Sequence, residues 1–222
     1  MNMVWHVLLA HFLADYPLQI PWILRHKRQT WAVAVHAGFH LVIMLLLVGV
    51  ERGRLWPYLA VLASVHFFID LGKNLVYKLR PRWVIAPYVV DQSIHYLAIW
   101  LIFVWIEAAV GATQPPFDPQ WALLATSYLV VMYVWHISER IMVYSSPSYQ
   151  AEVQAHFWPR MLTRSGLLTL LLVVSGLPST FSLVAISASL LPYISGKHRL
   201  RAFLTDSAVA CAIWLFIRSA SG

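Results

Sequence analysis

The sequence predicts an all-helical protein that crosses a membrane several times. Of its 222 residues, 60% are hydrophobic and only 11% are charged, whereas a soluble domain needs about 25% charged residues to cover its surface. The apolar residues also gather in runs of about 20, the length of α-helix that spans a bilayer. The one cysteine excludes an internal disulfide framework.

Eight apolar segments are predicted to span the membrane. They are residues 4–24, 31–50, 56–77, 88–110, 121–144, 161–177, 180–195 and 202–218. The sixth and seventh are short, and a single re-entrant pair is the alternative for them. Because proline removes a hydrogen bond from a helix, Pro17 and Pro21 predict a kink or break in the first segment.

Basic residues predict the orientation of these segments. Thirteen of the sixteen lysine and arginine residues lie in or beside the connections that follow the first, third, fifth and seventh segments. Basic residues favour the cytoplasmic side, so both termini are expected to face outward. The net charge of +7 is therefore interpreted as a topology signal. The basic residues form no single stripe, so no nucleic-acid partner is predicted.

Four pairs of ionisable residues lie within the first four segments, and the members of each pair are four positions apart. The pairs are His11 and Asp15, His36 and His40, His66 and Asp70, and Asp91 and His95. Residues at this spacing share one helix face with Cβ atoms about 5–6 Å apart, which suits two ligands of one metal ion. The first pair precedes the second by 25 residues, and the third pair precedes the fourth by the same distance. The sequence thus predicts a tandem repeat of two helical hairpins, 4–50 and 56–110.

All eight side chains are expected at one depth in the membrane. A rise of 1.5 Å per helical residue places them within roughly 5–20 Å of the cytoplasmic helix ends. Antiparallel helices with polar pairs at one depth resemble the carboxylate–histidine sites of di-metal bundle proteins. Residues 1–110 are therefore predicted to form a four-helix bundle with the site, supported by membrane helices in residues 111–222.

These residues predict a metal site, because ionisable side chains inside a membrane are costly and mark functional positions. Five histidines and three aspartates exceed the ligands of one zinc ion, so two divalent ions are expected. The mixed nitrogen and oxygen ligands suit Zn, Mn or Fe. A proton or ion relay is one alternative for the same residues, and structural polar packing is another.

Further polar residues are candidates for catalysis and substrate binding. Asp70 or Asp91 is expected to act as the general base. Lys73 follows Asp70 by three residues and is predicted to neutralise it or to bind an anionic group; the alternative is an interfacial lysine that reaches toward water. Gln19 and Gln92 are candidates for orienting a ligand or substrate.

Two features are expected in the second half of the chain. Glu139 and Arg140 are predicted to take part in ion pairs within or between helices. Residues 145–160 form the longest polar stretch and are expected to be a loop that separates the site from the last segments.

Six short motifs carry a resemblance to a known family. The motifs are HFLADYPLQ, a basic connector, HAGFH, HFFIDLGK, DQSIH and SERIM. Together they resemble the bacterial membrane family catalogued as domain of unknown function 3307, most closely over residues 11–95. The His/Asp pairs are also similar to those of small bacterial inner-membrane proteins described as metal-dependent hydrolases. The resemblance implies a multi-helix protein of the bacterial inner membrane and supports a hydrolase.

The predicted function is therefore a metal-dependent hydrolase that acts at the cytoplasmic leaflet. A lipid or lipid-linked phosphate is the expected substrate, since Lys73 and the basic connectors would attract an anionic head group. A metal-ion or proton transporter is the first alternative, although it would also need polar residues in the outer half of the membrane. A di-iron oxidase or desaturase is the second, although such sites usually contain more than five histidines.

Overall fold

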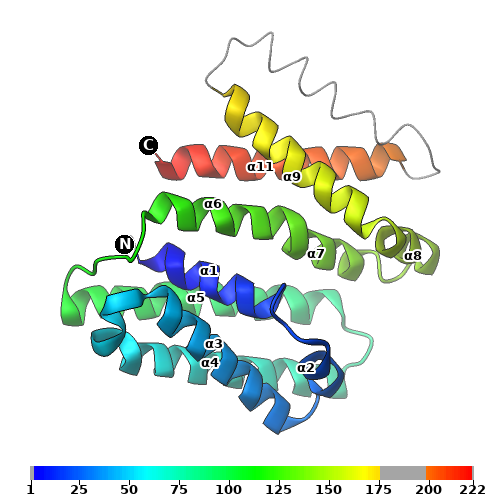
Figure 1. Cartoon of the computed structure of the whole chain (residues 1–222). Helices are drawn as coiled ribbons and strands as arrows, with labels where there is room; N and C mark the ends of the chain where they lie inside the picture. The colour runs from blue at the N-terminus through cyan, green and yellow to red at the C-terminus, as the bar shows by residue number, and fades with distance from the viewer. Residues whose placement is uncertain (1–2, 176–198, 222) are drawn as a thin grey trace. The chain divides into compact units, whose positions relative to one another are not determined.

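The computed structural model of the chain describes residues 3–175 and 199–221, and every regular element in these ranges is a helix (Figure 1). In chain order the elements are α1 (Val4–Asp15), α2 (Pro21–His26), α3 (Thr30–Leu47), η1 (Gly49–Glu51), α4 (Arg52–Leu79), α5 (Ile85–Val110), α6 (Pro119–Leu129), η2 (Val130–Val134), α7 (Trp135–Met142), α8 (Pro147–Ala155), α9 (Phe157–Val174) and α11 (Arg199–Ser221). The all-helical prediction is confirmed for the described residues.

Five helical stretches in the described ranges are long and apolar enough to cross a membrane. They are Thr30–Leu47, Gly49–Leu79, Ile85–Val110, Pro119–Met142 and Leu200–Ala220. These stretches coincide with five of the eight predicted segments and are consistent with a membrane protein. The predicted segment 161–177 overlaps α9, which is not among the five. The predicted segment 180–195 lies outside the described residues.

The first predicted segment, 4–24, is broken where its prolines predict a break. Helix α1 ends at Asp15, and α2 begins at Pro21. Proline suits the first position of a helix, where its missing N–H would have no partner. The 12 residues of α1 rise only about 18 Å, less than the roughly 30 Å hydrocarbon core of a bilayer. Asp15 therefore lies at the end of a short helix and not in the middle of a long one.

The chain divides into two compact units, residues 1–126 and 127–222. In the first unit, α1 packs against α3 and α5, and α4 packs against the same two helices. The four helices thus form a closed bundle in which successive members run in opposite directions (Figure 1). Residues 111–118 return to the corner between α3 and α4, where the backbone N–H of Gln114 donates to Oε1 of Glu51 at 3.2 Å.

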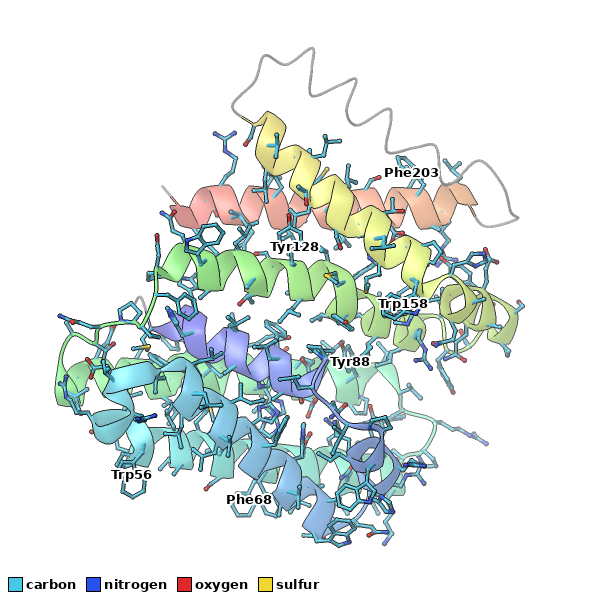
Figure 2. The ribbon with its side chains drawn as sticks, viewed as in Figure 1. Trp56, Phe68, Tyr88, Tyr128, Trp158 and Phe203 are labelled. Atoms are coloured by element: carbon cyan, nitrogen blue, oxygen red, sulfur yellow. The ribbon has the colours of Figure 1, made fainter. Side chains whose placement is uncertain are left out.

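The bundle of the first unit has an apolar interior over much of its length and an apolar exterior. The interior contains Val7, Leu59 and Phe103 from three of the helices, all buried. On the exterior, Trp56 is 58% exposed and Phe68 is 67% exposed (Figure 2). Large apolar side chains on an outer surface suit helices that face lipid, because lipid is as apolar as the side chains themselves.

The second unit begins within a long helical stretch, Pro119–Met142, and contains the helices that pack against its later part. Helix α6 continues through η2, a π-helical segment, into α7, and α9 packs against both η2 and α11. Helix α8 occupies most of the polar stretch 145–160, so the expectation of a loop there is wrong. Pro147 opens this helix at a position that favours proline, and Tyr149 and Val153, four residues apart, bury one face against Val143.

Arginines of α9 form a buried ion-pair network in the second unit. Arg160 joins Glu139 of α7, at 2.9 Å, to Asp206 of α11, at 2.7 Å. Arg164 is fully buried; its Nε donates to the carbonyl of Val131 in η2 at 2.6 Å. Glu139 therefore forms its ion pair with Arg160, which lies on a different helix. These partners account for two arginines in an otherwise apolar helix, since a buried charge is tolerated when it is paired.

Candidate metal centre

Each helix of the first-unit bundle brings one pair of ionisable residues inward. The pairs are His11 and Asp15 on α1, His36 and His40 on α3, His66 and Asp70 on α4, and Asp91 and His95 on α5. All eight are buried except Asp15, whose side chain is 12% exposed. The contacts described below link all eight side chains, so the predicted ligands gather in one cluster inside the bundle.

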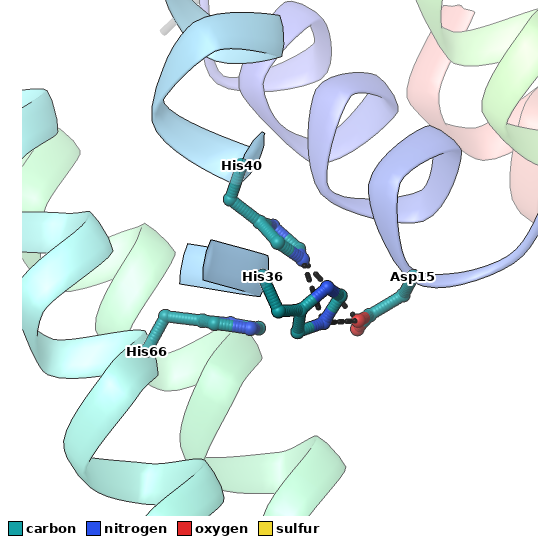
Figure 3. Close-up of side chains that lie close together, drawn as sticks. All are labelled: Asp15, His36, His40 and His66. Atoms are coloured by element: carbon teal, nitrogen blue, oxygen red, sulfur yellow. Dashed lines mark hydrogen bonds and ion pairs between the residues drawn. The ribbon is translucent and has the colours of Figure 1, made fainter. Parts of the chain in front are cut away.

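Three atoms from α1 and α3 form a small triangle. Nε2 of His36 lies 3.0 Å from Oδ1 of Asp15, and Nε2 of His40 lies 3.3 Å from the same oxygen. The two nitrogens are 3.3 Å apart, and Figure 3 shows both rings turned toward the carboxylate. A tetrahedral ion bound at about 2.0–2.1 Å keeps neighbouring ligand atoms about 3.4 Å apart. The triangle therefore matches one face of a tetrahedral metal site.

His66 extends this triangle into a group of four. Asp15, His36, His40 and His66 each offer one ligand atom, and these atoms all lie within 4.8 Å of one another (Figure 3). His66 also belongs to a second group that meets the same limit, with Asp70 and His95. Both groups are made of nitrogen and oxygen donors and could hold a divalent metal ion.

A small cavity lies among the imidazole rings. Its volume is about 10 Å³, and His11, His40, His66 and His95 line it together with apolar side chains. A space of this size holds about one water-sized atom. Three of the rings, those of His40, His66 and His95, are in close contact, with neighbouring centroids 3.9 and 4.3 Å apart. The histidines thus surround a space suited to a single atom and not to a larger ligand.

Several buried polar atoms of the cluster make no hydrogen bond. They are Nε2 of His11, His66 and His95, Nδ1 of His36, Oδ2 of Asp70 and Oδ1 of Asp91. Some of them are close neighbours: Nε2 of His66, for example, lies 3.5 Å from Oδ2 of Asp70. A buried polar atom without a partner costs about 1–3 kcal/mol. A bound cation would satisfy such nitrogen and carboxylate lone pairs together, so the residues present fit a metal ion.

Lys73 turns inward and joins the carboxylates of two helices. Its Nζ donates to Oδ1 of Asp70 at 2.6 Å and to Oδ2 of Asp91 at 2.9 Å. The lysine side chain is 14% exposed, and each carboxylate is 2% exposed. Lys73 is therefore part of the cluster and does not extend along the surface.

Gln92 and two tyrosines hold the Asp91 carboxylate. Nε2 of Gln92 donates to Oδ2 of Asp91 at 3.1 Å. The amide oxygen of Gln92 accepts hydrogen bonds from the hydroxyls of Tyr96, at 3.0 Å, and of Tyr16, at 3.3 Å. The two tyrosines were not predicted as site residues. Tyr96 lies four residues after Gln92, a spacing that indicates a shared helix face, but the contact of Tyr16 crosses between helices and has no signal in the sequence.

Gln19 lies beside the cluster and contacts none of the proposed ligand side chains. With its amide oriented to satisfy both neighbours, its nitrogen donates to the backbone carbonyl of Asp15 at 3.3 Å, and its oxygen accepts from Nζ of Lys27 at 2.9 Å. Gln19 therefore links the end of α1 to the basic connector.

A surface cleft lies next to the cluster at the end of α4. Its volume is about 720 Å³, and its lining residues are Arg28, Asn74, Tyr77, Lys78, Pro81 and Val84. Asn74 donates to the backbone carbonyl of Lys27 at 2.8 Å and so ties α4 to the connector before α3. Tyr77 lies four residues after Lys73, so the cleft and the cluster share one face of α4.

Comparison with known proteins identifies a family to which the chain belongs. No curated protein and no solved structure matches the chain. The model of a family described as "Protein of unknown function (DUF3307)" matches residues 3–124, a range that contains all four helices of the bundle and all eight residues of the cluster. Because this match covers more than half of the chain, the protein belongs to the DUF3307 family.

Proposed function

We propose that the first unit is a metal-dependent hydrolase of the bacterial inner membrane. The observation that carries this proposal is the triangle of Asp15, His36 and His40, whose sides of 3.0 and 3.3 Å match a bound divalent ion. His66 supplies the fourth ligand. The nitrogen and oxygen donors suit Zn, Mn or Fe. When bound, such an ion polarises a scissile phosphoryl group and lowers the pKa of a water molecule, which is the chemistry of hydrolysis.

Asp91 is the proposed general base. Its Oδ2 is held by Lys73 and Gln92, whereas its Oδ1 is buried and makes no hydrogen bond. An oxygen fixed in place but without a donor is available to accept a proton. Asp70 is the alternative base from the sequence, and its Oδ2 is likewise without a hydrogen bond.

The proposed substrate is a lipid or lipid-linked phosphate in the cytoplasmic leaflet. Arg28 and Lys78 line the cleft at the end of α4, and these cations would attract an anionic head group. The apolar exterior around the bundle leaves the acyl chain in lipid. Asn74 and Tyr77 add hydrogen-bonding groups to the cleft, which suit phosphate oxygens.

We also propose how the chain is arranged in the membrane. The paired hairpins α1–α3 and α4–α5 support a tandem repeat, because each hairpin carries two ligand pairs on facing helices. Eight membrane segments and outward-facing termini remain the topology predicted by the basic connections.

The apolar interior favours a hydrolase over a transporter. On α5, the buried residues beyond His95 are Ile99, Ile102, Phe103 and Ile106. On α4, Leu55, Leu59 and Leu62 occupy the same half of the bundle. Along these faces of α4 and α5, an ion leaving the cluster would meet aliphatic and aromatic side chains, which is costly for a charge. The buried ionisable residues of the described first unit toward that end are His6 of α1 and Glu51 of η1.

The test is hydrolysis of phospholipid phosphomonoesters by purified protein in vesicles. We expect phosphate release that a chelator abolishes and that added Zn, Mn or Fe restores. Asp91→Asn should lower the rate about 100-fold or more, whereas Asp118→Asn, a matched change in an exposed loop, should leave it unchanged. Activity that survives complete metal removal would contradict the proposal.

A further inference from the structure

Lys73 occupies the position of a bridging cation between two helices. We propose that Lys73 replaces a second metal ion, so that the resting site binds one divalent cation although its ligand count allows two. This inference rests on the proposed function, because it specifies the content of the same site. It makes Lys73 a positioning residue that holds two carboxylates together.

The geometry of Lys73 is that of an ion bound between two carboxylates. Asp70 and Asp91 come from different helices, and Nζ lies 2.6 Å from one and 2.9 Å from the other. In di-metal bundle sites, carboxylates from facing helices are joined by the two ions. Here an ammonium group already joins them, and both carboxylates are almost completely buried.

The charges around the cluster favour one ion over two. The carboxylates of Asp15, Asp70 and Asp91 are balanced in part by Lys73 and by Lys27, which interacts electrostatically with Asp70. With neutral imidazole ligands, these groups leave one negative charge in excess. One divalent ion changes the balance to one positive charge, whereas two ions leave three positive charges inside the bundle. Uncompensated buried charge is strongly unfavourable.

The arrangement of the ligands also favours one ion over two. His66 is a member of both candidate groups. Two ions that filled both groups would compete for its ring, and the group that lost it would be left with two ligands, Asp70 and His95, or three, Asp15, His36 and His40. The group of Asp15, His36, His40 and His66 supplies four donors to one ion without requiring Asp70 or Asp91.

The experiment measures the number of ions per chain in the full-length protein after saturation with Mn²⁺ and removal of the excess. We expect about one equivalent in the wild type and about two in Lys73→Met, because loss of the ammonium leaves two carboxylates free to bind a cation. Lys73→Arg keeps the charge and should keep one equivalent. Lys78→Met, on the exposed end of the same helix, controls for loss of a lysine and should also keep one.

A second measurement decides the question even if Lys73→Met does not fold. Electron paramagnetic resonance of the wild type should show magnetically isolated Mn²⁺, whereas two neighbouring ions would give a spin-coupled spectrum. Two ions in the wild type, or one ion in a folded Lys73→Met variant, would overturn the inference and leave the proposed function standing. A wild type that binds no ion would contradict both.

Discussion

The carboxylate of Asp15 faces three imidazole rings, and this arrangement defines the chemistry of the cluster. Oδ1 lies near His36 and His40, while Oδ2 lies 3.3 Å from Nε2 of His11. Nε2 of His11 makes no hydrogen bond there. Imidazole nitrogens and carboxylate oxygens are ligand types that divalent metals such as zinc bind. Gln92 has a different part: it donates to Oδ2 of Asp91 and accepts hydrogen bonds from the two tyrosines.

Gln92→Leu tests whether Gln92 orients the carboxylate of Asp91. The change removes the amide that orients Asp91, so we expect the hydrolysis rate to fall about 10–100-fold while the metal content stays near the wild-type value. Elemental analysis and a phosphate-release assay on the same preparation measure both quantities. Gln120→Leu, on the exposed side of α6, is the matched control. Loss of metal together with activity would show that Gln92 supports the whole cluster and not Asp91 alone.

At the scale of elements, the spacing of four residues predicted which side chains gather in the candidate cluster. It places His11 with Asp15, and each other pair, on one helix face, and the structure has helices at all four positions. The same reasoning could not find Tyr16, because its contact with Gln92 depends on how α1 packs against α5. It also assigned Glu139 no specific partner, since Arg160 lies on a different helix. Residues 145–160 were predicted to be a loop because most of them are polar. They contain α8, in which Tyr149 and Val153 are buried on one face.

The corner between α3 and α4 provides a test at this scale. Gly49 has φ of +60°, and a Cβ there would lie 2.8 Å from Cβ of Pro116. Gly49→Ala should therefore destabilise the protein by about 1–3 kcal/mol, read as a lower unfolding temperature in detergent. Gly53→Ala is the control: no atom lies within 4 Å of its added Cβ, and alanine favours the helix by roughly 0.5–1 kcal/mol. Equal unfolding temperatures for the two variants would contradict this account of the corner.

At the scale of the whole molecule, composition predicted the class and the structure defines the layout of each unit. In the part of the chain that the structure describes, five stretches are long and apolar enough to span a membrane, but α1 is too short, because this helix ends at Asp15, before Pro17. Hydropathy counts apolar residues and does not register that break directly. The two units also differ in their buried polar contacts. The second pairs its buried arginines with acids, whereas several nitrogen and oxygen atoms of the cluster in the first make no hydrogen bond.

Elemental analysis of detergent-purified protein tests the central claim, that the first-unit bundle holds a metal ion. The wild type is compared with a His36→Ala, His66→Ala double variant and with a control, His26→Ala, His156→Ala, which removes two histidines from outside the cluster. We predict Zn, Mn or Fe in the wild type and in the control, and its loss from the first double variant. Wild-type protein without metal, although never exposed to a chelator, or equal metal in all three proteins, would contradict the account.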